Sequence, residues 1–263
     1  MCMLHTIIRM NIIQKRDILI QIAQLASEVI LHEKHTHLRV WSKPDHSTVT
    51  SADLASEQVI LRELRNHFPQ TPVVSEEEHA SGKRVTWTHN AWLVDPLDST
   101  SGFARGSSDY AICIAEIVNN QPEWGVIAIP EPGITYVGHV SSQQCWKVQG
   151  GNLTQLLPPQ QHETPYSCVL SPTDALVRKL VSDWQIQFRG SALKFGLVAE
   201  GASDIYVRSG HLMSWDIAAG DAIVRSLGGS CTTHTGAPFV YACNQSYMMP
   251  FVARSSAVRS HPL

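Results

Sequence analysis

Five short apolar runs follow one another through the middle of the chain, and this series limits its fold more than any other feature. The runs occupy residues 91–94, 111–118, 124–129, 135–140 and 145–148. Gly, Pro and Asn stand in the turns between them, as is typical of consecutive strands. The pattern predicts a series of short strands through this part of the chain.

Two helices are expected before these strands. Apolar residues recur at helical spacing through residues 11–32, which predicts an amphipathic helix with one buried stripe. A second helix is predicted over residues 50–68, because Thr50 and Asp53 have the spacing of a capping box and Pro69 follows. The first ten residues are expected to be a loose extension.

The second half of the chain alternates strand and helix patterns. Predicted strands occupy residues 166–170, 185–188 and 204–207, and predicted helices begin at residues 171, 191 and 214. Residues 156–165 are rich in Pro, Gln and His without periodicity, so a division into an N-terminal half, 1–155, and a C-terminal half, 156–263, is expected. Mixed elements in both halves predict a layered α/β fold.

Composition argues against several classes of protein. Among 263 residues the formal net charge is −3, which disfavours a nucleic acid polymer as partner. Charged residues interrupt the apolar stretches of residues 1–20, so neither a signal peptide nor a transmembrane segment is expected. Six cysteines are scattered without a C-x-x-C pair, which favours a reducing cytoplasm, with association at the inner face of the membrane left open.

Two carboxylates follow the first buried run. Asp95 and Asp98 stand three positions apart across a turn that Pro96 stiffens. Such a turn can direct both side chains and the Leu97 carbonyl at one point, as a hard cation such as Mg²⁺ requires. The competing interpretation is a surface turn, because Asp and Pro are common turn residues.

Two further acidic sites favour a metal site over a simple turn. Glu76 follows the apolar residues 73–75, and Asp216 is expected in the first turn of a helix rich in Gly and Ala. Each has an ordinary alternative. Residues 76–78 could be a solvated charge run, and Asp216 could merely interact with a helix N-terminus.

Three signatures follow one another along the chain: SEE at residues 75–77, WLVDPLDST at 92–100, and WDIAAG at 215–220 with GG at 228–229. Together they resemble the inositol monophosphatase superfamily of lithium-sensitive, magnesium-dependent phosphatases. The resemblance extends from the first predicted helix to about Gly236. It implies an α/β/α/β/α layered sandwich with a magnesium site of two or three ions between the halves, and a small phosphorylated molecule as substrate.

The second half contains the segments GSALKF at residues 190–195, LVAEG at 197–201 and DIYVR at 204–208. Within that superfamily, these segments resemble the CysQ-type 3′(2′),5′-bisphosphate nucleotidase branch. The branch converts 3′-phosphoadenosine 5′-phosphate to AMP. Ser191 at a helix N-terminus would favour an anion, and Lys194 and Arg208 could bind the phosphate that is not cleaved. The alternative is that both cations are solvated surface charges.

The resemblance also implies a role for each site residue. The N-terminal half would carry most metal ligands, and the C-terminal half the last ligand and the phosphate contacts. The first magnesium would be held by Glu76, Asp95 and the Leu97 carbonyl, and the second by Asp95, Asp98 and Asp216. Asp53 and Thr100 would orient and deprotonate the attacking water, and Asp53 could also cap its helix. Substrate binding would involve Glu76, Ser99, Thr100, Ser191, Lys194, Arg208 and Asp216.

Two departures from the family pattern keep other functions open. Ser99 replaces a Gly that could adopt a backbone conformation costly for other residues. Ser101 and Gly102 stand where the nucleotidase branch often carries a charged pair. The alternatives are an inositol monophosphatase or related sugar-phosphate phosphatase, and a homologue that binds phosphorylated ligands without turnover. Both a monomer and a homodimer agree with the sequence.

Overall fold

The computed structural model describes residues 10–160, 166–172, 174, 184–210, 212–242, 247–248 and 250–258. The expected N-terminal extension, the helix entered at residue 171 and part of the connection at 156–165 lie largely outside these residues. None of the helices described combines the length and apolar character that a membrane span requires.

Two long helices form the first layer. Helix α1, Ile12–His35, is capped by Asn11 and buries Leu19, Ile22 and Ile30 among other residues of one stripe. Helix α2, Ser51–His67, begins with the predicted capping box. Both pack against one face of the larger sheet, where their apolar residues share a core with the strands. The amphipathic pattern therefore predicted both helices and their buried faces.

The larger sheet contains seven strands that lie side by side in sequence order. Strands β3 and β4 are parallel, and every later neighbouring pair is antiparallel. A hairpin of β1, Val40–Ser42, and β2, Thr48–Thr50, precedes α2. The seven strands are β3 Val73–Ser75, β4 Ala91–Asp98, β5 Ala111–Val118, β6 Gln121–Ile129, β7 Ile134–His139, β8 Gln144–Gln149 and β9 Asn152–Leu156.

The smaller sheet has the order β11-β10-β12-β16-β14. Its strands are β10 Ser167–Leu170, β11 Gln185–Phe188, β12 Ile205–Arg208, β14 Ser230–Thr233 and β16 Phe251–Arg254. Two short strands, β13 Leu212–Met213 and β15 Tyr247–Met248, pair with each other. Strands β14 and β16 were not among the predicted elements.

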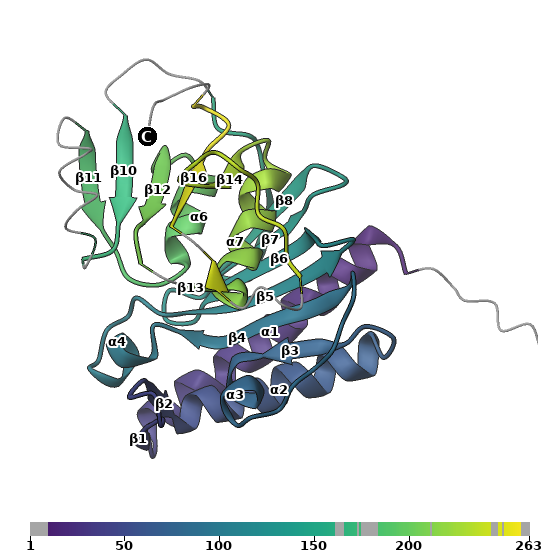
Figure 1. The fold of residues 1–263 in the computed structure, drawn as a ribbon, viewed down its shortest axis with the longest axis vertical. Helices are drawn as coiled ribbons and strands as arrows, with labels where there is room; N and C mark the ends of the chain where they lie inside the picture. The colour runs from purple at the N-terminus through teal and green to yellow at the C-terminus, as the bar shows by residue number, and fades with distance from the viewer. Residues whose placement is uncertain are drawn as a thin grey trace, which may run out of the picture.

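Helices α6, Leu193–Ala199, and α7, Ser214–Ser226, lie between the two sheets (Figure 1). Close approach of α7 to the larger sheet depends on Gly125 and Gly138, where an added Cβ would lie 2.2 Å from the Ala219 carbonyl and 2.8 Å from the Ile223 Cα. One core cluster joins both sheets and both helices. The predicted layered α/β fold is confirmed, whereas the division at residue 155 stays a prediction.

Two local expectations differ from the structure. The segment from Asp95 to Asp98 is the end of β4 and not a separate turn, with a register shift against β5 between these two residues. Such an irregularity changes the direction of the side chains that follow. The helix expected from residue 191 begins at Leu193, so Ser191 precedes it. Two short helices, α3 Glu76–Ala80 and α4 Thr100–Ala104, were not predicted.

Candidate functional site

Carboxylates from three elements converge beside the end of β4. Glu76 begins α3 directly after β3, Asp95 lies near the end of β4, and Asp216 is in the first turn of α7. One oxygen from each lies within 4.8 Å of the others. Strands β3 and β4 are parallel neighbours, so the residues that follow them meet at one edge of the sheet. We call Glu76, Asp95, Asp98 and Asp216 the metal edge.

The register shift in β4 separates the directions of Asp95 and Asp98. Asp95 is 1% exposed and accepts a hydrogen bond of 3.0 Å from the Leu97 amide. Asp98 instead accepts a hydrogen bond from the Ala192 amide in the C-terminal half. The two carboxylates of the DPLD motif therefore connect one strand to two different parts of the site.

Crowding of carboxylates at the metal edge opposes their ionisation. Burial raises the pKa of Asp95 well above its usual value, and Glu76, Asp98 and Asp216 raise it further. Burial also raises the pKa of Asp216 to about 8, with Asp98 and Glu76 adding to the shift. A divalent cation would reverse this balance, and carboxylate and carbonyl oxygens are the ligands that Mg²⁺ prefers. The residues present thus fit the metal site that the sequence predicts.

Lys43, on the β1–β2 hairpin, was not identified from the sequence. Its ammonium lies 2.8 Å from Glu76 and 2.7 Å from Glu77 and is nearly buried. Burial alone would lower the pKa of Lys43, but the two carboxylates raise it overall. The residue offered no spacing signal, because it lies in a polar turn more than thirty positions before its partners.

Asp53 uses its two carboxylate oxygens for two purposes. Oδ2 accepts hydrogen bonds from the Thr50 amide, at 2.8 Å, and from the Thr50 hydroxyl, at 2.5 Å, which completes the helix cap. Oδ1 accepts a 2.8 Å hydrogen bond from the Thr100 hydroxyl, which also lies 2.9 Å from the Leu97 carbonyl. Capping therefore leaves one oxygen directed at the metal edge, and burial raises the pKa of this carboxyl.

Ser99 occupies a left-handed backbone conformation. Its φ of 75° precedes α4, in the region that costs non-glycine residues about 1–2 kcal/mol. The structure thus agrees with the sequence-based expectation that Gly would be favoured here. The next residue, Thr100, donates a hydrogen bond to Asp53.

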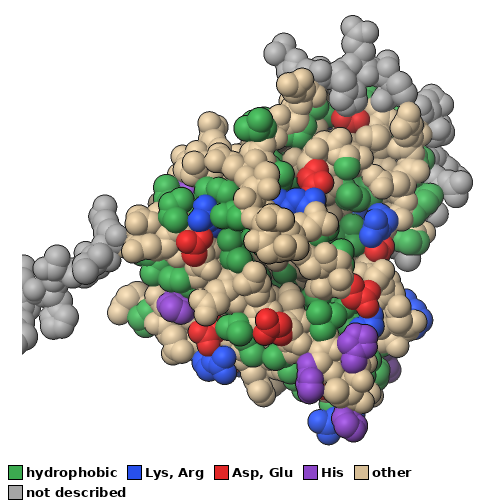
Figure 2. Space-filling model, turned by 180° about the vertical axis from the view of Figure 1, so that it is seen from behind, with side chains coloured by type: hydrophobic (Ala, Val, Ile, Leu, Met, Phe, Trp, Pro, Cys, Tyr) green, Lys and Arg blue, Asp and Glu red, His purple; other side chains and the backbone are tan. Residues whose placement is uncertain are grey.

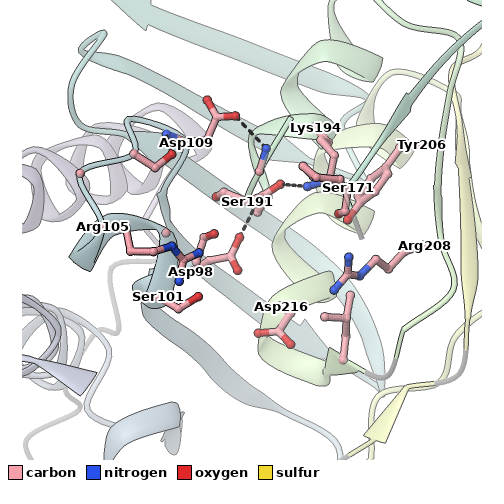
Figure 3. Close-up of a pocket in the computed structure, with 18 residues that line it drawn as sticks. Asp98, Ser101, Arg105, Asp109, Ser171, Ser191, Lys194, Tyr206, Arg208 and Asp216 are labelled. Atoms are coloured by element: carbon pink, nitrogen blue, oxygen red, sulfur yellow. Dashed lines mark hydrogen bonds between the residues drawn. The ribbon is translucent and has the colours of Figure 1, made fainter. Parts of the chain in front are cut away.

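Two cavities meet at the metal edge. A cavity of about 410 Å³ is lined by Glu76, Asp95 and Thr100, and one of about 790 Å³ by residues of both halves. Both are lined by Asp98, Ser99, Ser101 and Asp216. The larger is also lined by the cations Arg105, Lys194 and Arg208, which Figure 3 shows around the same space as Asp98 and Asp216. We call it the cation cavity.

Lys194 is not a solvated surface charge. It is 2% exposed, and its ammonium donates to the Ser191 carbonyl and, at 3.3 Å, to the Arg189 carbonyl. It also lies 4.9 Å from the centre of the Tyr206 ring. Burial lowers the pKa of Lys194 to about 8. Arg208 is only partly exposed, and its guanidinium lies 3.3 Å from the Asp174 carboxylate. The interpretation as a solvated surface charge is therefore wrong for Arg208 as well.

The loop around Ser191 is held from both sides. Asp109, from the N-terminal half, accepts hydrogen bonds from the Arg189 guanidinium, the shortest at 2.7 Å, and from the Gly190 amide at 2.7 Å. Ser191 has a positive φ of 57°, and its buried hydroxyl has no hydrogen-bond partner among the described residues. An unpartnered buried hydroxyl in a cavity wall suits a ligand that accepts hydrogen bonds. Asp109 and Arg189 were not recognised in the sequence, where nothing indicated that they would meet.

Comparison with known sequences gives a family match over most of the chain. The model of the inositol monophosphatase family matches residues 14–252. The 3′(2′),5′-bisphosphate nucleotidase CysQ of Escherichia coli K12 is 31% identical over 239 residues, which cover 89% of this chain and 96% of that protein. The protein of the same name from Buchnera aphidicola is 32% identical over 232 residues, with coverage of 86% and 87%.

Solved structures support the same fold. CysQ from Bacteroides thetaiotaomicron has a TM-score of 0.74 at 24% identity, and the match covers 94% of this chain and 99% of that one. A protein described as an IMPase/NADP phosphatase, complexed with NADP and Ca²⁺, has a TM-score of 0.78 at 17% identity, with coverage of 94% and 93%. At these identities the likeness shows the layered fold.

Proposed function

This chain belongs to the inositol monophosphatase family, and we propose that it is a magnesium-dependent nucleotidase. Its substrate would be 3′-phosphoadenosine 5′-phosphate, from which it would release the 3′-phosphate to leave AMP. One observation carries the proposal: an acidic cavity and a cavity lined by cations share Asp98 and Asp216. A substrate with two phosphates can place one at the metal edge and the other in the cation cavity.

The metal edge provides the ligands for two magnesium ions. Glu76, Asp95 and the Leu97 carbonyl would hold one, and Asp98 and Asp216 would share the second with Asp95. Bound magnesium would lower the pKa of a water molecule and stabilise the leaving oxygen. Titration of magnesium in the activity assay distinguishes a site of two ions from one of three.

Asp53 and Thr100 would handle the proton of the attacking water. Thr100 donates its hydroxyl hydrogen to Asp53 Oδ1, so its own oxygen lone pairs can accept a hydrogen bond from water. A proton leaving the water can pass to Thr100 while the Thr100 proton passes to Asp53. Burial raises the pKa of Asp53, which makes its carboxylate a better base.

The cation cavity would bind the phosphate that remains. Ser191 offers an unpartnered hydroxyl, and Lys194 and Arg208 add positive charge to the cavity wall. Lys194 also orders the loop that carries Ser191, because its ammonium contacts two carbonyls of that loop. The wall is therefore arranged before substrate arrives.

The test is a panel of phosphate-release assays with magnesium titrated and lithium added. We expect a higher kcat/KM on 3′-phosphoadenosine 5′-phosphate than on inositol 1-phosphate. The opposite order would support an inositol monophosphatase. Binding of the nucleotide without turnover would support a non-catalytic homologue.

A paired variant comparison links the panel to the site. Asp216→Asn should abolish magnesium-dependent release from every substrate. Arg62→Gln, which changes an exposed residue of α2 that pairs only with neighbouring Glu63 among the described residues, serves as the control and should retain activity.

A further inference from the structure

The charged groups around the cation cavity differ in how far the protein already satisfies them. Asp174 lies 3.3 Å from Arg208, and backbone carbonyls accept hydrogen bonds from Lys194. Arg189, adjacent to the cavity wall, forms an ion pair of 2.7 Å with Asp109. These three cations stabilise the walls, so only part of their hydrogen-bonding capacity remains for a ligand.

Arg105 differs from these three. It lines the same cavity, yet its guanidinium takes part in no hydrogen bond or ion pair found among the described residues. Figure 3 shows its side chain extending from the end of α4 into the space around Asp98 and Ser191. A guanidinium presents five donors in a planar fork that matches a phosphate group.

Packing of α4 fixes the backbone that carries Arg105. Phe103 is 1% exposed and packs edge-on against Tyr110 with ring centres 4.7 Å apart. Lys34, from α1, lies 5.4 Å and 5.1 Å from the centres of these two rings. Two residues correspond to about 200° of helix rotation, so Arg105 projects from the side of α4 opposite this buried anchor.

The position along α4 also separates Arg105 from the reaction centre. Thr100, which contacts Asp53, begins the helix, and Arg105 follows its last residue. Five residues of helix advance about 7 Å, more than the width of one phosphate group. The backbone of Arg105 is therefore separated from Thr100 by the length of α4, while its side chain enters the cation cavity near Asp98 (Figure 3).

We propose that Arg105 is a specificity-determining residue that binds the second, uncleaved phosphate of a bisphosphorylated substrate. This inference rests on the proposed function, because it takes the metal edge as the place where the other phosphate is hydrolysed. It assigns the discrimination between one and two phosphates mainly to Arg105. In this chain Ser101 and Gly102 precede it, so it is the cation that α4 brings to the cavity.

The experiment compares substrates that differ only in the second phosphate. Wild type, Arg105→Gln and Arg105→Lys are assayed with magnesium on 3′-phosphoadenosine 5′-phosphate and on adenosine 3′-phosphate. We expect Arg105→Gln to lower kcat/KM about 10- to 100-fold on the bisphosphate, mainly through KM, because a charge-assisted pair is lost. Activity on adenosine 3′-phosphate should stay within about twofold, and Arg105→Lys should recover part of the loss.

Arg62→Gln is the matched control, since it removes an exposed arginine that does not line the cavity. An equal loss on both substrates would overturn the proposal, because Arg105 would then act on a group that they share. No loss on the bisphosphate would overturn it as well.

A binding measurement separates this inference from the proposed function. Titration calorimetry of AMP and adenosine against the magnesium-loaded protein reports the uncleaved phosphate without turnover. If wild type fails to hydrolyse the bisphosphate but Arg105→Gln weakens AMP binding and not adenosine binding, the proposed function fails and the assignment of Arg105 stands. If AMP binding is unchanged in Arg105→Gln, the assignment is wrong.

Discussion

The metal edge and the cation cavity share two carboxylates, but they differ in how far the protein itself balances their charged groups. At the metal edge, burial raises the pKa of Asp95 and Asp216, and the charges of Asp98 and Glu76 raise the pKa of both further. In the cavity, Lys194 and Arg208 already have partners within the protein. A cation from solution would relieve the crowding of carboxylates in the first region, whereas contacts within the protein already hold the walls of the second.

The face of the molecule seen in Figure 2 does not share this contrast. On the face shown in Figure 2, Lys and Arg side chains are interspersed with Asp and Glu and form no single patch. Among the described residues, the cavity lined by Glu76 and Asp95 has no lysine or arginine in its wall, whereas the cation cavity has three cations beside its carboxylates.

Asp95→Asn should have the largest effect, because it changes the charge of the metal edge and leaves the cation cavity intact. Loss of a metal ligand removes several kcal/mol of transition-state stabilisation, so turnover should fall about 1000-fold on every phosphomonoester. The pKa of Asp95 is higher in the folded state than in the unfolded state, where it is about 3.9. The free energy of unfolding therefore falls as pH rises from the unfolded-state pKa towards the folded-state pKa. Without metal at pH 7, the variant should therefore have the higher Tm.

Scanning calorimetry with and without magnesium measures the Tm of both proteins. Magnesium should raise the Tm of wild type and leave that of Asp95→Asn nearly unchanged. Asp17→Asn, at an exposed carboxylate of α1, is the control and should behave as wild type. A lower metal-free Tm in Asp95→Asn would contradict the repulsion that we infer.

Asp53→Asn should separate catalysis from metal binding within the same region. The amide can still accept the hydrogen bond from Thr50 that caps α2, but it cannot take a proton from Thr100. We expect kcat to fall about 100-fold while magnesium still raises Tm. If kcat is retained, Asp53 is only a helix cap, and Thr100→Val then tests whether the hydroxyl is needed at all.

The pH dependence of substrate binding should reveal the cation cavity. Burial lowers the pKa of Lys194 to about 8, so the side chain loses its charge as pH rises through that value. Affinity for a bisphosphate should decline accordingly, and kcat/KM should fall about tenfold between pH 7 and pH 9. Lys194→Met should lack this decline. A decline of equal size in the variant would assign it to the metal edge.

Ser99→Gly should produce the smallest effect, at the point where the two regions join. Glycine relieves the cost of the left-handed conformation but adds entropy to the unfolded chain, so the net gain should be about 0.5–1 kcal/mol. Tm should rise by about 2 °C without loss of turnover. A fall in either quantity would show that the Ser99 side chain makes a contact that the reaction or the fold requires.

Prediction from sequence succeeded where the physical cause is local. The stripe of α1, the capping box of Thr50 and Asp53, and the strand at residues 111–118 depend on neighbours within a few positions, and the structure has all three. The resemblance to the inositol monophosphatase superfamily predicted that the distant acidic residues form one site. The structure places Glu76, Asp95 and Asp216 together, while their roles as ligands stay predictions.

Long-range contacts were not predicted from the sequence, because no residue spacing encodes them. Lys43 reaches Glu76 only through the fold of a hairpin, and Arg189 meets Asp109 only because the two halves face each other. The register shift in β4 likewise depends on pairing with β5.

The sequence by itself determined the alternation of helices and strands, the acidic motif at the end of β4 and the unfavourable Ser99, because propensity, periodicity and motif are local properties. Only the tertiary structure decided that Lys194 is buried and Arg105 is not, since burial depends on which elements pack over a side chain. That difference in burial and partners separates the cation that orders the cavity from the one that remains for a substrate.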